Sequence, residues 1–230
     1  MPIGVFGKYP GRRDFISVGM PQSILSPLEK WLQAGLATSK EAFGMRWKEM
    51  FLVQPIWNFR LGREVSGVDC LGAFMPSVDG VGRYFPLLLL AYPGDKSFGY
   101  PLWMDLDIAS WFGTVHAALL ATLSDSDLPD PAEIAKSVAE PPSVAIVEGE
   151  GKPGSRGLRI EMGEQDRGDF REVLQRHDLA FAGNRQSVWW TDGGAHVARQ
   201  VLVVPGMPEP HIFSGMLGPT AAVGEAQASV

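Results

Sequence analysis

Residues 75–86, MPSVDGVGRYFP, place a serine, an aspartate and an arginine in a stretch that is otherwise apolar. Ser77 offers a nucleophile and Asp79 a carboxylate, and a distant histidine would complete a hydrolytic set. A hydrolase serine, however, needs small glycines on both sides, whereas Ser77 follows a proline and precedes a valine. A nearby Arg83 also keeps a carboxylate ionised and makes it a poorer general base. These residues favour a structural role over hydrolysis, and we expect no catalytic residue in this segment.

The structural alternative for the same segment is a rigid turn. Ser77 and Asp79 would hydrogen-bond the turn's backbone, while Gly80 and Gly82 would adopt positive φ angles. Arg83 would then fold back onto Asp79 as a charge-assisted pair that holds the turn closed. This hypothesis predicts a fixed loop between two strands.

Three other features point to chemistry only weakly. The segment GVFGKYP lacks the spacing of a nucleotide-binding loop, because Tyr9 and Pro10 follow Lys8 where a serine or threonine and a helix are needed. The histidines at 116, 177, 196 and 211 form no i, i+4 pair, so we expect no metal site and no cofactor. Cys70 is the single cysteine and is expected to be a buried structural thiol.

The apolar pattern predicts the elements that hold these residues. A first strand is expected over Ile3–Phe6, and a helix is expected from Ser26, with a Ser26–Glu29 capping box and Pro27 at its first position. A hairpin is expected from residues 56–61 and 70–75, and a strand apolar on both faces over 85–92. The other expected elements are a helix over 107–123, a short helix after 124–133, strands over 143–149, 156–162, 187–193 and 200–206, and a helix over 169–177.

Length and composition bound the fold. The chain has 230 residues, of which 45% are hydrophobic and 20% charged, which is enough for one core of α/β size. We expect a three-layer α/β/α sandwich with a mixed sheet, formed by one domain over residues 1–218, followed by a flexible tail over 219–230.

Charge and hydropathy argue against two classes of partner. The net charge of −6 and the absence of a basic run make nucleic acid an unfavourable partner. The N-terminus has no basic leader before a long apolar stretch, and the apolar run around residues 87–90 is too short to span a bilayer. We therefore expect a cytoplasmic protein without stable membrane insertion.

Four motifs occur in an order that resembles one family. They are GVFGKYPGRRDFI, PIWNFRLG, GAFMPSVDGVGRYFPLLL and SVWWTDGG, spread from Gly4 to about Leu217. The chain resembles the TagF family, which is associated with bacterial type VI secretion. The resemblance implies a non-enzymatic, cytoplasmic, post-translational repressor of secretion-system assembly that binds the forkhead-associated scaffold protein Fha. Some members of the family carry a PP2C-like phosphatase domain in the same chain. For this chain the resemblance implies that such a phosphatase would be a separate protein and a further partner.

The resemblance also implies which residues carry the family's signature segments and are candidates for partner binding. They are Gly7, Lys8, Pro10, Asp14 and Phe15 near the N-terminus, Pro76, Ser77, Asp79, Gly82, Arg83, Tyr84 and Phe85 in the signature segment, and Trp190. The chain departs from the family pattern at two positions, where Arg13 replaces a usual glycine and Val18 a usual arginine. If those family residues contact the partner, binding is altered in this chain.

Two classes of function remain open, and each makes a structural prediction. A regulatory binding module needs a switchable interface, whereas an assembly factor of the apparatus needs a permanent one with a broad apolar patch. A hydrolase, the third class, needs a base within hydrogen-bond reach of Ser77. We further predict that Asp14 and Arg83 lie on one side of the molecule, and that Trp189 and Trp190 are buried on opposite faces of one strand.

Overall fold

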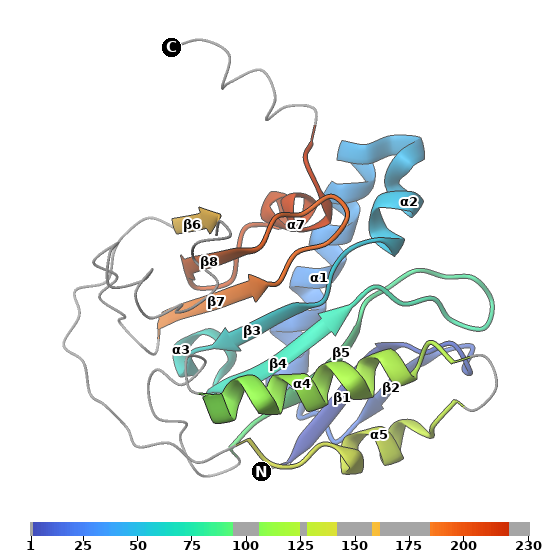
Figure 1. The fold of residues 1–230 in the computed structure, drawn as a ribbon, viewed down its shortest axis with the longest axis vertical. Helices are drawn as coiled ribbons and strands as arrows, with labels where there is room; N and C mark the ends of the chain where they lie inside the picture. Colours follow the sequence, from blue (N-terminus) through green and yellow to red (C-terminus); the bar gives the residue numbers. More distant parts are fainter. Residues whose placement is uncertain (1, 94–105, 125–127, 142–157, 162–184, 221–230) are drawn as a thin grey trace.

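The computed structural model describes residues 2–93, 106–124, 128–141, 158–161 and 185–220, and these form an α/β fold (Figure 1). In these ranges eight strands make one sheet in the order β2-β1-β5-β4-β3-β7-β8-β6. The strands are β1 (Ile3–Lys8), β2 (Phe15–Val18), β3 (Trp57–Leu61), β4 (Cys70–Met75), β5 (Leu87–Ala91), β6 (Leu158–Glu161), β7 (Gln186–Thr191) and β8 (Gln200–Pro205). The helices are α1 (Gln22–Phe43), η1 (Gly44–Arg46), α2 (Trp47–Leu52), α3 (Arg63–Ser66), α4 (Leu106–Ala121), α5 (Pro131–Ser137) and α7 (Pro210–Leu217).

The prediction of a mixed sheet is wrong, because every strand pair in the described sheet is antiparallel. A parallel pair needs a crossover helix that returns the chain to a neighbouring strand. Here α1 and α2 connect β2, at the sheet edge, to β3, which is not its neighbour. The neighbours β1 and β2, β3 and β4, β4 and β5, and β7 and β8 follow each other in the chain as hairpins.

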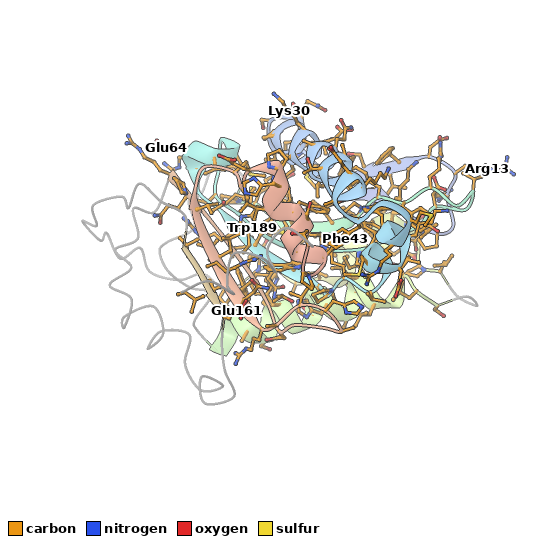
Figure 2. All side chains as sticks on the ribbon, turned by 90° about the horizontal axis from the view of Figure 1, so that it is seen from above. Arg13, Lys30, Phe43, Glu64, Glu161 and Trp189 are labelled. Atoms are coloured by element: carbon orange, nitrogen blue, oxygen red, sulfur yellow. The ribbon has the colours of Figure 1, made fainter. Side chains whose placement is uncertain are left out.

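Helices pack on both faces of the sheet, as Figures 1 and 2 show. α4 and α5 cover one face, where Ile108, Trp111 and Val115 join one apolar cluster. α1, α2 and α7 cover the other face, where a second cluster holds many of the aromatic rings. β5 alternates between the two clusters along its leucines, so its uninterrupted apolar sequence is explained by burial on both sides.

The two adjacent tryptophans of β7 confirm the same alternation. Trp189 lies in the cluster under α1 and α7, and Trp190 lies in the cluster under α4. Both rings are buried. Figure 2 places Trp189 inside the molecule near α7. Successive side chains therefore reach opposite layers, as the period of a strand requires.

The start of the first long helix differs from the prediction. α1 begins at Gln22, with Pro21 at its N-cap, and Pro27 lies inside the helix, so Ser26 is not a cap. The extra turn extends the apolar stripe of the helix with Ile24 and Leu25, which are both buried. Burial of these two side chains offsets the hydrogen bond that proline cannot donate. The predicted face from Leu28 to Leu36 is confirmed.

Several other elements also follow the prediction. β1 extends the expected first strand by two residues, and β3 and β4 form the expected hairpin. The stripe of α4 is buried as expected, and α5, β6, β7 and β8 fall within or next to their predicted ranges. The predicted strand over 143–149 and helix over 169–177 lie outside the described residues. None of the helices in the described ranges is long and apolar enough to cross a membrane.

The strand order brings two connections to the same end of the sheet. We call residues 9–14, between β1 and β2, the N-terminal turn, and residues 76–86, between β4 and β5, the signature loop. β1 pairs directly with β5, and Gly7 near the end of β1 lies opposite Leu87 at the start of β5. The N-terminal turn and the signature loop therefore leave the sheet side by side.

Candidate functional site

The N-terminal turn and the signature loop are in direct contact. The backbone N–H of Gly80 donates a hydrogen bond to the carbonyl oxygen of Arg12 at 2.9 Å. The Arg83 guanidinium lies 3.7 Å from the Asp14 carboxylate, so these two side chains are on the same side of the molecule, as predicted. The neighbouring positions of β1 and β5 account for this contact.

The Asp79 carboxylate is the centre of this site. Its Oδ1 accepts hydrogen bonds from the backbone N–H groups of Val81 and Arg83, at 3.0 and 2.9 Å. Its Oδ2 contacts Lys8 Nζ at 2.9 Å and accepts a hydrogen bond from Arg83 Nε at 2.7 Å. The Asp79 side chain has no exposed surface, and Lys8 is also buried. Four donors from two segments of the chain therefore converge on one carboxylate.

These donors determine the protonation state of Asp79. Burial raises the pKa of the carboxyl group, but the hydrogen bonds from Arg83, Lys8 and Val81 outweigh burial and hold its pKa well below the usual range. The group is therefore ionised at neutral pH. A carboxylate of such low basicity is a poor proton acceptor, and its bonding serves to fix the loop.

The backbone of the signature loop forms a small closed hairpin. Val78 and Tyr84 form an isolated β-bridge, and the N–H of Phe85 donates to the carbonyl oxygen of Ser77 at 3.1 Å. Gly82 has a φ of 83°, as predicted, and this is a backbone conformation that glycine adopts more readily than other residues. Gly80 is not among the residues with positive φ. Its role is to allow close approach, since a Cβ there would lie 3.0 Å from the Pro10 carbonyl oxygen.

Aromatic contacts attach the loop to the rest of the fold. The Tyr84 ring makes edge contacts with Trp47 and Phe51 of α2, with centroids 5.7 and 6.0 Å apart. The Phe85 ring makes edge contacts with Phe6 of β1 and with Phe15 at the start of β2, and Phe6 stacks on Phe15. The Lys8 ammonium lies 4.1 Å from the centre of the Phe15 ring. Aromatic rings of the loop thus pack against α2 through Tyr84 and against β1 and β2 through Phe85.

Ser77 does not complete a hydrolytic set. Its side chain is buried, and its Oγ has no hydrogen-bond partner among the described residues. The prediction that this hydroxyl bonds the turn is therefore wrong, because the loop is closed through the Ser77 backbone instead. Within the described ranges no histidine or carboxylate is placed to accept the serine proton, so the hydrolase hypothesis gains no support.

Two further residues considered for chemistry have structural partners. His116 Nε2 lies 2.6 Å from Asn58 Oδ1, and burial lowers the pKa of the imidazole, which favours the neutral form. Cys70 is buried beside Ser66, and burial raises the pKa of the thiol to about 12. The thiol is therefore protonated at neutral pH and unreactive. In the described ranges no cluster of three or more metal-ligating side chains is found.

The outer surface of the site combines apolar and basic groups. Phe15 is 44% exposed and Val81 is 54% exposed, both well above what a core residue shows. The Arg83 side chain is 53% exposed, although its Nε reaches Asp79. Arg13 is exposed in the N-terminal turn, where Figure 2 shows it projecting from one end of the molecule. Such a mixture of aromatic, aliphatic and guanidinium groups is typical of protein-binding surfaces.

Trp190 lies apart from the other predicted site residues. It belongs to β7, and β3 separates β7 from the strands that carry the signature loop. Its ring is 7% exposed and makes an edge contact with Phe112 of α4 at 4.9 Å. The remaining predicted residues all lie in or next to the N-terminal turn and the signature loop.

Some contacts of the site could not be identified from the sequence. The buried cation on Asp79 is Lys8, 71 positions away, whereas the sequence pointed only to Arg83. Arg12 forms an exposed ion pair with Asp130 at 3.1 Å, and the Tyr9 hydroxyl donates to the carbonyl of Pro129. No local signal marks these contacts, because they depend on where α5 packs.

A comparison with family models decides the relationship. The model described as "TagF N-terminal domain, Type VI secretion system-associated" matches residues 4–137, which include the N-terminal turn and the signature loop. The chain belongs to the TagF N-terminal domain family. The match confirms the resemblance seen in the motifs.

One solved structure extends the relationship of this TagF-family chain beyond the matched residues. The crystal structure of PA0076 from Pseudomonas aeruginosa PAO1 at 2.05 Å resolution is 27% identical, with a TM-score of 0.68. The alignment covers 99% of this chain and 96% of that chain. β7, β8 and α7, which follow the matched residues, thus have counterparts in the similar structure. A search of curated proteins finds no match.

The low pKa of Asp79 predicts an acid-dependent stability in this TagF-family chain. A depressed pKa in the folded state stabilises the fold above the ordinary value of 3.8, and this stability is lost as the pH falls through the folded pKa. We expect Asp79→Asn to lower the melting temperature at pH 7 and to flatten its decline below about pH 4. Thermal melts from pH 7 to pH 2 measure both effects.

Asp14→Asn is the matched control for the acid experiment, because the Asp14 side chain is 95% exposed. It should leave the melting curve of the wild type almost unchanged at every pH. An Asp79→Asn variant whose melting temperature follows that of the wild type from pH 7 to pH 2 would contradict the role given to Asp79.

Proposed function

We propose that this chain is a non-enzymatic, cytoplasmic regulator of type VI secretion, which represses assembly of the system after translation by binding the forkhead-associated scaffold protein Fha. The family match supports a role associated with type VI secretion. The repression and the identity of the partner come from the family resemblance, and a separate PP2C-like phosphatase is proposed as a second partner.

The observation that carries the proposal is the bonding of Asp79. The only fully buried carboxylate of the signature loop is occupied by two cations and two backbone N–H groups, which leaves it no part in proton transfer. The hydrogen bonds and ion pairs of Asp79 therefore fix the shape of the loop. What the loop presents outward is a fixed surface of exposed side chains, which is the requirement for binding with little loss of entropy.

The composition of this surface favours a switchable interface. Arg83 and Arg12 are exposed and each lies near an acidic side chain, and Val81 and Phe15, which are close to them in the chain, are also exposed. A guanidinium at the rim of an interface accelerates association and confers salt dependence more than it adds affinity. Such an interface forms and dissociates more readily than a wholly apolar one.

Arg83→Ala tests whether the arginine serves the fold or the partner. Because its side chain is half exposed and Lys8 remains on Asp79, we expect its removal to cost less than about 1 kcal/mol of stability. The variant should keep nearly the melting temperature of the wild type but bind purified Fha more weakly in a titration, with a shallower salt dependence.

Lys8→Met is the matched comparison for Arg83→Ala. It removes the buried partner of Asp79, so it should lower the melting temperature clearly more than Arg83→Ala does. If Arg83→Ala destabilises the chain as much as Lys8→Met while the folded protein binds Fha normally, the assignment of Arg83 to partner binding is wrong.

A second candidate function is that of a structural accessory factor of the secretion apparatus. It is favoured by the exposed leucines at positions 52, 120, 123 and 128, which gather near the ends of α2 and α4. An accessory factor would stay bound to the apparatus in all conditions. Copurification with the apparatus from cells with secretion active and repressed separates the two: constant recovery supports the accessory factor, and recovery that changes with the state supports the regulator.

A further inference from the structure

The Arg83 guanidinium is bound through only one of its three nitrogens. Its Nε donates to Asp79 Oδ2 at 2.7 Å, while its Nη1 and Nη2 make no hydrogen bond with any residue in the described ranges. The Asp14 carboxylate lies 3.7 Å from Nη2, which is too far for a hydrogen bond. Because half of the side chain is exposed and its buried contact is made through Nε, the other two nitrogens are left for a partner.

Lys8 leaves Arg83 able to serve a second carboxylate. Lys8 Nζ lies 2.9 Å from Asp79 Oδ2 and is buried with it, so Asp79 already has a cation of its own. A lysine in place of Arg83 would have one nitrogen, which could contact either Asp79 or a partner. The guanidinium can use Nε for Asp79 and its Nη1–Nη2 edge for the partner at the same time.

The charges of the two segments favour a carboxylate as the ligand. Residues 8–14 and 76–86 hold four cationic side chains and two carboxylates, and Asp130, outside them, pairs with Arg12 at 3.1 Å. One positive charge is thus in excess, and the exposed Arg13 makes no ion pair within the described part of the chain. A single carboxylate balances this excess, whereas a phosphate group brings about two negative charges.

Asp14 lies beside the open edge of the guanidinium in the free chain. Its side chain is 95% exposed and its contact with Arg83 is long, so the attraction is weak and screened by water. A carboxylate at hydrogen-bond distance would gain two parallel N–H···O bonds from Nη1 and Nη2, which Asp14 does not make. Asp14 is therefore placed to compete with an incoming carboxylate and to be displaced by it.

We propose that Arg83 anchors an acidic side chain, glutamate or aspartate, of the partner protein, and that Asp14 competes with this side chain for the guanidinium. The incoming carboxylate accepts two parallel hydrogen bonds from Nη1 and Nη2, while Nε stays on Asp79. Arg13, next to Asp14 in the chain, adds a second positive charge. The proposal rests on the proposed function in that the partner supplies the carboxylate.

A double-mutant cycle on the binding of purified Fha tests the competition. Asp14→Asn removes the competing charge, so it should tighten binding by about threefold. Arg83→Ala should weaken binding by about tenfold, the effect of losing charge-assisted hydrogen bonds. In the double variant the gain from Asp14→Asn should vanish, because the group for which the two carboxylates compete is gone. An equal gain with and without Arg83 would overturn the proposal.

Arg83→Lys separates the two-bond geometry from charge alone. The variant keeps the positive charge but has one nitrogen, so it should bind Fha nearly as weakly as Arg83→Ala does. Affinity equal to that of the wild type would contradict the proposal, because charge alone would then suffice.

Glu64→Gln is the matched control for Asp14→Asn. Glu64 is also an exposed carboxylate beside an arginine, 2.8 Å from Arg185 Nε, and the substitution changes the charge by the same amount. Figure 2 shows Glu64 and Arg13 at opposite ends of the molecule. Glu64→Gln should therefore leave the affinity for Fha unchanged, and a gain equal to that of Asp14→Asn would reduce the Asp14 effect to net charge and overturn the competition.

A peptide probe makes the test independent of Fha. Acetyl-tetraglutamate amide is titrated into the isotope-labelled full chain at constant ionic strength, and the Nε–Hε NMR signal of Arg83 is followed. The signal should shift with this peptide, and shift further in Asp14→Asn, but should stay in place with acetyl-tetraglutamine amide. Inorganic phosphate should shift it less than the glutamate peptide does. A larger shift with phosphate would overturn the choice of a carboxylate as the ligand.

The outcomes distinguish this proposal from the proposed function. If the glutamate peptide leaves the Arg83 signal unshifted in the wild type and in Asp14→Asn while Fha still binds the chain, the anchoring role of Arg83 is wrong and the proposed function stands. If the peptide shifts the signal as expected but Fha does not bind, Arg83 anchors acidic segments and the proposed function fails.

Discussion

Gly7→Ala is expected to cost about 4 kcal/mol or more of the free energy of unfolding, enough to leave a protein of ordinary stability largely unfolded. Gly7 has a φ of 135°, which alanine rarely adopts. A Cβ at this position would lie 2.0 Å from the Pro86 carbonyl oxygen and 2.9 Å from the Leu87 Cα, two backbone atoms where the signature loop joins β5. The clash can be relieved only by separating β1 from β5, which would also part Lys8 from Asp79.

Gly113→Ala provides the control for this experiment. Gly113 lies inside α4, and a Cβ there would have no atom within 4 Å. Alanine should therefore stabilise the chain by about 0.5–1 kcal/mol through its better helix propensity. Denaturant unfolding of both variants measures the difference, and a Gly7→Ala protein as stable as Gly113→Ala would show that β1 and β5 are not as close as described.

Trp190→Ala is expected to destabilise the chain by about 3–5 kcal/mol, as removal of a core tryptophan does. The ring is 7% exposed and packs against Phe112, in the cluster that joins α4 to the sheet. Urea unfolding measures the loss. The folded fraction of the variant should bind Fha with unchanged affinity, because the ring lies away from the signature loop.

Met45→Ala is the comparison for Trp190→Ala, since Met45 is fully exposed in η1. It should change the stability by no more than about 0.5 kcal/mol. If Trp190→Ala were equally harmless to stability but abolished Fha binding, Trp190 would be a partner-binding residue and not a core residue.

The parts of the fold that were predictable are those specified by a local period. The leucines of β5 and the tryptophan pair of β7 alternate between two apolar clusters, and the stripe of α4 recurs at helical spacing. Each of these patterns needs only that both faces of the sheet be covered, so it holds for any strand order. The antiparallel pairing of the described strands was missed because it depends on which strands become neighbours.

The candidate site was predictable to a similar extent. The Asp79–Arg83 contact spans four residues and follows from the turn between them. The Lys8–Asp79 contact depends on the pairing of β1 with β5, which no local pattern specifies.

Hydrogen exchange of the chain with and without purified Fha tests most directly whether the N-terminal turn and the signature loop form the partner-binding surface. The account predicts that binding slows exchange at backbone amides of residues 11–15 and 80–84, beyond the protection that the Gly80 and Arg83 amides already have in the free chain. The N–H groups near Trp190, in the interior of the sheet, should be unaffected. Protection confined to other surfaces, with residues 11–15 and 80–84 exchanging as in the free chain, would contradict the account.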